Sequence, residues 1–105
     1  MVKVDKSTTQ EKEKTKMIKL NKTTQKAKGF IRAYQNSTNY RLEDCYTNFS
    51  YAKDRAYDYC INKMQKMGGS YGCIISYNTC FFTFAFEVND KLIVICPTNE
   101  YEIQL

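Results

Sequence analysis

The segment from residue 71 to the end alternates between apolar and polar positions, a pattern that a sheet accommodates and a helix does not. Residues 80–88 read CFFTFAFEV, and every second residue of this run falls on one side of an extended chain. Three aromatic residues share that side: Phe82, Phe84 and Phe86. The β-branched and aromatic runs at 71–77 and 91–96 flank it, and Asn89-Asp90 suits a two-residue hairpin turn. The pattern predicts an antiparallel meander whose phenylalanines lie in the core.

Two further segments extend the predicted sheet. Pro97 ends the strand that precedes it, and residues 101–105 alternate as expected for a short edge strand. Residues 28–35, KGFIRAYQ, also alternate and predict a strand before the meander. Asn78-Thr79 is a plausible turn between the first two strands of the meander.

A single long helix is predicted between these strands. Thr47, Asn48 and Ser50 offer N-cap side chains, and Gly68-Gly69 supplies the stop. Seven apolar residues form one stripe at helical spacing: Phe49, Ala52, Ala56, Tyr59, Cys60, Met64 and Met67. The sequence therefore predicts an α+β fold in the order β-α-β-β-β, with one amphipathic helix packed on a four- to five-stranded, mainly antiparallel sheet.

Charge divides the chain into two parts. Residues 1–28 contain nine lysines and three acidic residues, whereas the other 77 residues contain seven basic and eight acidic ones. Residues 1–16 have too few apolar side chains to offset the entropy of ordering them. We therefore expect a flexible lysine-rich tail over 1–16 and a single α+β domain over 17–105. The first residues to touch the core are expected to be Met17, Ile18 and Leu20.

The residue inventory disfavours catalysis. The chain contains no histidine, the commonest general base, metal ligand and partner of a nucleophile. It has five cysteines, none in a C-x-x-C pair: Cys45, Cys60, Cys73, Cys80 and Cys96. In a reducing compartment they are best interpreted as small buried residues. We expect no enzyme activity, no catalytic residue, no metal site and no cofactor.

A basic set of residues suggests contact with nucleic acid. It continues from the tail onto the domain and consists of Lys14, Lys16, Lys19, Lys22, Lys26, Lys28, Arg32 and Tyr34. Lysines attract the phosphate backbone without reading its sequence. A tail that only keeps the protein in solution is the alternative, since recognition of phosphates and bases favours arginine.

The outer face of the predicted helix is a second candidate surface. It presents an acidic and aromatic strip that suits a protein partner: Tyr51, Asp54, Tyr57, Asp58 and Ile61. An ordinary solvated face is the alternative. Asp54 and Asp58 lie one helical turn apart, but no third ligand accompanies them, so they do not predict a metal site.

No run of apolar residues approaches the roughly 20 that a membrane span requires. The first residues, MVKVDKSTTQEKEK, lack the apolar region and cleavage site of a secretory signal. The sequence therefore predicts a cytoplasmic protein with no membrane contact.

The run SYNTCFFTFAFEVNDKLIVICPTNEYEI at 76–103 resembles a hairpin of small domains found in phages, plasmids and their bacterial hosts. In size, composition and lack of catalytic residues the chain is similar to small phage anti-defence proteins, including anti-CRISPR inhibitors. The resemblance implies a non-catalytic protein in the host cytoplasm that inhibits a defence complex such as a CRISPR effector. Many such inhibitors are acidic mimics of nucleic acid, and the basic tail departs from that pattern.

The sequence therefore favours two alternative functions. The first is inhibition of a host protein or ribonucleoprotein complex through the folded body. The second is an accessory role in binding RNA or DNA through the basic tail. The oligomeric state is left open.

Overall fold

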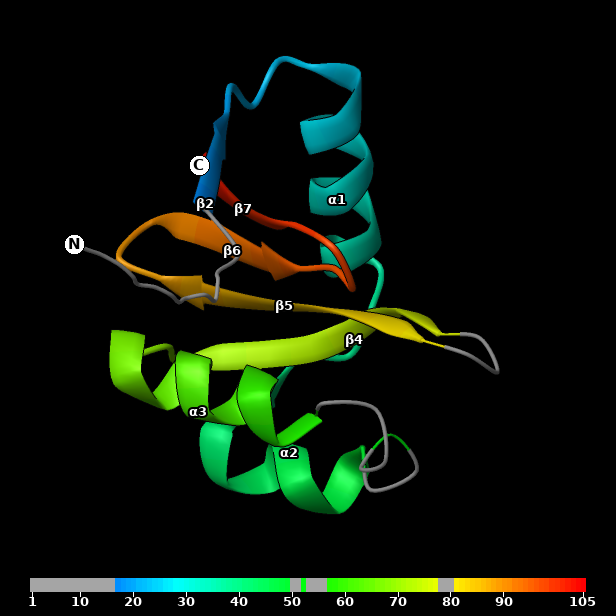
Figure 1. Cartoon of the computed structure of the whole chain (residues 1–105), viewed down its shortest axis with the longest axis vertical. Helices are drawn as coiled ribbons and strands as arrows, with labels where there is room; N and C mark the ends of the chain where they lie inside the picture. Colours follow the sequence, from blue (N-terminus) through cyan, green and yellow to red (C-terminus); the bar gives the residue numbers. More distant parts are fainter. Residues whose placement is uncertain (1–16, 50–51, 53–56, 78–80) are drawn as a thin grey trace, which may run out of the picture.

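The computed structural model describes residues 17–49, 52, 57–77 and 81–105. It is an α+β fold built on a six-stranded sheet with the strand order β2-β7-β6-β5-β4-β3 (Figure 1). In chain order the elements are β2 Met17–Leu20, α1 Gln25–Gln35, β3 Tyr40–Arg41, α2 Leu42–Asn48, α3 Tyr57–Met67, β4 Tyr71–Tyr77, β5 Phe82–Val88, β6 Lys91–Ile95 and β7 Glu100–Gln104. The predicted fold class is confirmed, with more strands and more helices than the sequence indicated.

The predicted meander is confirmed as β4, β5, β6 and β7, each antiparallel to the next. Asn89 and Asp90 connect β5 to β6 with φ values of 48° and 62°. This left-handed backbone at both central residues is the geometry that a tight hairpin turn requires. The predicted turn at Asn78-Thr79 lies outside the described residues.

The prediction that residues 101–105 form an edge strand is wrong. β7 lies between β6 and β2, and β2 pairs with it in parallel from Met17 opposite Glu100 to Leu20 opposite Ile103. Ile103 on this strand is fully buried. Met17 and Leu20 do pack against the core as expected, whereas Ile18 is exposed.

The predicted strand at 28–35 is wrong, because these residues belong to helix α1. Thr24 caps this helix, and its Oγ1 accepts a hydrogen bond from the Ala27 backbone N–H at 3.2 Å. The residues that face the sheet follow the i, i+3, i+4, i+7 helical spacing: Ala27, Phe30, Ile31 and Tyr34. A segment that starts at Lys28 leaves out Ala27, and the residues that remain then seem to alternate as in a strand.

The predicted long helix is shorter and is preceded by a separate helix. Asn48, a predicted N-cap, ends α2, and α3 begins only at Tyr57. Gly68 at φ +76° provides the predicted stop, since left-handed backbone favours glycine. Four residues of α3 face the core: Tyr57, Cys60, Ile61 and Met64.

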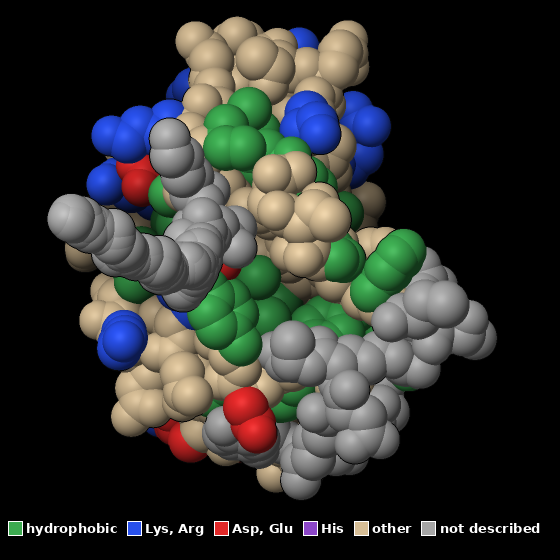
Figure 2. All heavy atoms as spheres, viewed as in Figure 1, with side chains coloured by type: hydrophobic (Ala, Val, Ile, Leu, Met, Phe, Trp, Pro, Cys, Tyr) green, Lys and Arg blue, Asp and Glu red, His purple; other side chains and the backbone are tan. Residues whose placement is uncertain are grey.

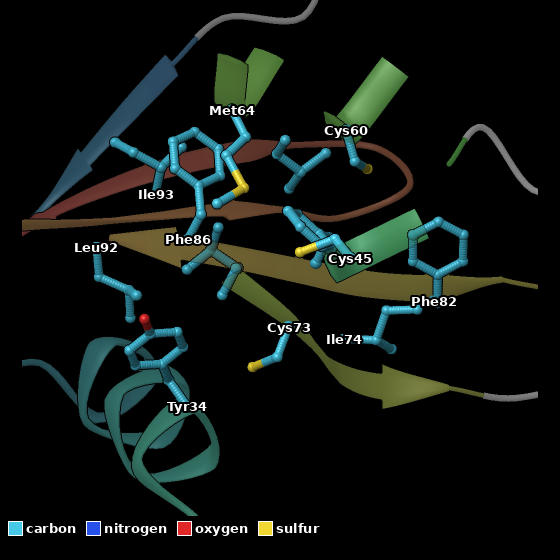
Figure 3. Packing of buried hydrophobic residues seen from close by; sticks show 14 of the residues in the cluster. Tyr34, Cys45, Cys60, Met64, Cys73, Ile74, Phe82, Phe86, Leu92 and Ile93 are labelled. Carbon is cyan, nitrogen blue, oxygen red and sulfur yellow. The ribbon is translucent and has the colours of Figure 1, made fainter. Parts of the chain in front are cut away.

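The helices cover both faces of the sheet (Figure 1). Phe86 and Ile93 point toward Met64 of α3, while Leu92 points toward Tyr34 of α1 on the opposite face (Figure 3). Phe84 and Phe86 are fully buried, which confirms the predicted core. Since both faces of the sheet are buried, even small residues such as Ala85 and Cys73 belong to the core.

Candidate functional site

Two of the five residues of the predicted protein-binding strip lie in the core instead of on an outer face. Tyr51 and Asp54 lie outside the described residues, and Asp58 is exposed. Tyr57 is fully buried and Ile61 is only 2% exposed, so their assignment to an outer face is wrong. Tyr57 donates a hydrogen bond to the Cys45 carbonyl at 2.5 Å, which ties α3 to α2. The later start of α3 places both side chains against the sheet.

The predicted basic set largely remains on the surface. Lys14 and Lys16 lie outside the described residues, while five cations are exposed: Lys19, Lys22, Lys26, Lys28 and Arg32. We call these five the basic surface. Tyr34 is wrongly assigned to it, because it is buried under α1 and its hydroxyl donates to Glu87 Oε1 at 2.9 Å. Burial and this hydrogen bond raise the pKa of Tyr34.

The basic surface is set apart by charge from the remainder of the protein. Residues 17–35 contain five basic residues and no acidic one, whereas residues 36–105 contain six basic and eight acidic ones. Figure 2 shows Lys and Arg side chains gathered over the part of the molecule that β2, α1 and their connection form. Within the described ranges no carboxylate forms an ion pair with any of the five, while Arg41, Lys63 and Lys91 are each paired.

Helix α1 directs two of these cations away from the sheet. Its apolar side packs on the sheet, so Lys28 and Arg32, one turn apart, project together from the opposite side. Lys26 lies nearer the sheet, with its Nζ 3.3 Å from the Tyr101 hydroxyl and 5.1 Å from the centre of that ring. The exposed side of α1 therefore presents Lys28 and Arg32, with Lys26 nearer the sheet.

Residue 29, between Lys28 and Arg32 in the sequence, is a glycine that the local structure does not require. A Cβ placed on it meets no atom within 4 Å, and its backbone is helical. Glycine within a helix costs about 1 kcal/mol relative to alanine. One role of glycine is to allow a ligand to approach the backbone closely.

A second feature, which sequence reasoning missed, is a buried carboxylate at the start of β7. Glu100 is 2% exposed, and its Oε1 lies 2.9 Å from Lys63 Nζ. Its Oε2 accepts a hydrogen bond from the Tyr59 hydroxyl. Burial and the bond to Glu100 raise the pKa of Tyr59 to about 12, so the hydroxyl remains a donor at neutral pH.

Tyr59 and Lys63 line a groove between α3 and the β2–β7 pair. The groove has a volume of about 640 Å³ and is lined by Met17, Tyr59, Asn62, Lys63, Lys66, Met67 and Glu102. Tyr59, which the sequence placed on the core stripe, is 47% exposed. The sequence contains one signal for the groove. Tyr59 and Lys63 lie one helical turn apart, and the apolar stripe of the helix is continuous without Tyr59.

The cysteines do not provide a reactive group among the described residues. Cys45, Cys60 and Cys73 are buried, as the sequence predicts, whereas Cys96 is only partly buried and Cys80 lies outside the described residues. Burial, and to a lesser degree Glu100, raises the pKa of the Cys60 thiol to about 12, which keeps it protonated. No three His, Cys, Asp or Glu side chains within the described ranges come together as a metal site would require.

Comparison with known proteins adds no assignment: no protein family, curated protein or solved structure matches this chain. No helix in the described part of the chain is long and apolar enough to span a membrane.

Proposed function

We propose that this protein is a non-catalytic nucleic-acid-binding protein that holds the phosphate backbone on its basic surface. The observation that supports the proposal is the segregation of charge: residues 17–35 contain five cations and no carboxylate, whereas residues 36–105 are slightly acidic. Cations without paired carboxylates are available to neutralise phosphates and release their counterions.

The shape of α1 supports the same function. Lys28 and Arg32 lie beside Gly29 on the exposed part of the helix, so two charges are close to a position that has no side chain. A phosphodiester chain can approach the helix closely there. Lys26 adds a third cation, whose Nζ lies 5.1 Å from the centre of the Tyr101 ring.

Inhibition of a host defence complex, the function that the resemblance implies, remains a prediction. Tyr57 and Ile61, two of the residues on which it depended, lie in the core. If the target is a ribonucleoprotein, its RNA is the component whose charge the basic surface complements.

The test is the salt dependence of oligonucleotide binding, measured by fluorescence anisotropy with the full chain. In the Lys28→Gln, Arg32→Gln double variant we expect the slope of log K against log salt to fall by about 1.4 for a single strand. A control with the same change in net charge replaces the paired cations Arg41 and Lys91 with Gln and should keep the original slope. Equal slopes for the two double variants would reject the basic surface as the site of binding.

A further inference from the structure

The buried Glu100 requires an explanation that the core does not provide. It occupies a position on β7 opposite Ile95, on the sheet face that α3 covers, where an apolar residue would fit. A buried carboxylate is costly unless it is paired and hydrogen-bonded. Side chains from one flank of α3 approach both oxygens: Oε1 forms an ion pair with Lys63 at 2.9 Å but accepts no hydrogen bond from a described residue, and Oε2 accepts one from the Tyr59 hydroxyl.

The consequence of this arrangement is that two flexible side chains are held in place at the surface. Tyr59 is held through its hydroxyl, but the residue remains 47% exposed. Lys63 is fixed through its ammonium group and lines the same groove. Groups that are ordered before a ligand arrives lose less entropy when they bind it. Glu100 is therefore a positioning residue for Tyr59 and Lys63.

The groove has the size and the chemical groups that suit a nucleotide. Its volume of about 640 Å³ lies within the range of small-molecule sites. Tyr59 offers an aromatic ring, Asn62 an amide that both donates and accepts, and Lys66 a cation with no ion pair to a described carboxylate. Aromatic rings beside lysines are the groups that hold unpaired bases and their phosphates.

We propose that this groove binds one unpaired nucleotide of a single-stranded nucleic acid, with the base stacked on Tyr59 and a phosphate at Lys66. This inference rests on the proposed function, because the same strand continues onto the basic surface. Strand β2 connects the two sites: Met17 lines the groove, and Lys19 lies opposite Glu102, another residue of the groove wall.

The experiment compares two probes of about twelve units that carry the same phosphates, a single-stranded oligonucleotide and an abasic strand. We expect the full-length protein to prefer the strand with bases by about tenfold, as expected for one stacked base. Tyr59→Leu should abolish that preference, and Tyr59→Phe, which keeps the ring, should retain most of it. Circular dichroism and thermal unfolding check that each variant is folded.

The outcomes separate this inference from the proposed function. Equal affinity of the unmodified protein for both probes, or a preference that persists in a folded Tyr59→Leu variant, would overturn the nucleotide site while leaving the basic surface intact. Failure of both probes to bind at low salt would overturn the proposed function and the groove with it. If polyglutamate of similar length competes as well as the oligonucleotide, the groove recognises charge alone and the nucleotide site is rejected.

Discussion

Replacing Lys63 with Met removes the only cation that forms an ion pair with Glu100 among the described residues. At 2.9 Å the attraction between the two charges is about 6 kcal/mol at an effective dielectric constant of about 20. Most of this attraction offsets the cost of taking Glu100, 2% exposed, out of water. Without Lys63 that cost is uncompensated, and we expect the free energy of unfolding to fall by about 3 kcal/mol.

Urea denaturation followed by circular dichroism measures this loss, and thermal melting should show a fall of roughly 12 to 24 °C for a domain of this size. Lys66→Met, three residues further along α3, is the matched control and should change stability by less than about 0.5 kcal/mol. Adding Glu100→Gln to the Lys63→Met variant removes the buried charge and should restore most of the stability. If Lys63→Met is as stable as the unmodified protein, the ion pair does not offset the burial of Glu100 and the reasoning fails.

Three further predictions concern the core, the helix surface and pH. Phe84→Ala should lower the free energy of unfolding by about 4 kcal/mol in urea denaturation, because this ring is fully buried; a loss below about 1 kcal/mol would contradict its place in the core. Gly29→Ala should raise the free energy of unfolding by about 1 kcal/mol yet weaken oligonucleotide binding; unchanged affinity would remove Gly29 from the interface. Cys60 should make stability fall as pH rises from 9 toward 12, since its pKa moves from 9.0 in the unfolded chain to about 12 in the fold and the unfolded state loses its proton first. Urea midpoints at pH 8 and 10 should therefore separate less in Cys60→Ala than in the unmodified protein.

The parts of the fold that the sequence predicts well are those where one local signal suffices. The alternation around Phe84 and the Asn89-Asp90 turn define β5 and β6 within their own residues. The parallel pairing of β2 with β7 joins segments at the two ends of the described chain. Nothing in a four-residue strand specifies a partner so distant in sequence, so β7 was predicted as an edge.

Helix α1 shows how a short pattern can support two structures. In an eight-residue window, a strand would place Phe30 and Tyr34 on one face and Ile31 on the other, whereas a helix places all three on one face. The Thr24 cap and the buried Ala27 decide between them, and both precede the alternating segment. A search for the cap before the pattern would have identified the helix.

The site was only partly predictable for a related reason. The cations of the basic surface are exposed whether residues 28–35 form a strand or a helix, so they were identified correctly although the secondary structure was not. The cluster of Glu100, Tyr59 and Lys63 cannot be identified from the wrong helix assignment, because its geometry depends on which side of α3 faces the sheet. Counting Tyr59 as a core residue concealed the groove and left Glu100 in an apparent loop.

The α1 part of the basic surface and the groove lie on opposite faces of the sheet, and this separation constrains the nucleic acid that can reach both. Lys28 and Arg32 lie on the helix that covers one face, whereas Tyr59 lies over the other, with β2 between them (Figure 1). A duplex has a persistence length of about 50 nm and does not bend around the edge of so small a sheet without a large cost. A single strand bends freely and exposes its bases for stacking. The geometry therefore favours single-stranded DNA or RNA over a duplex, and the contribution of Tyr59 should disappear when the probe is double-stranded.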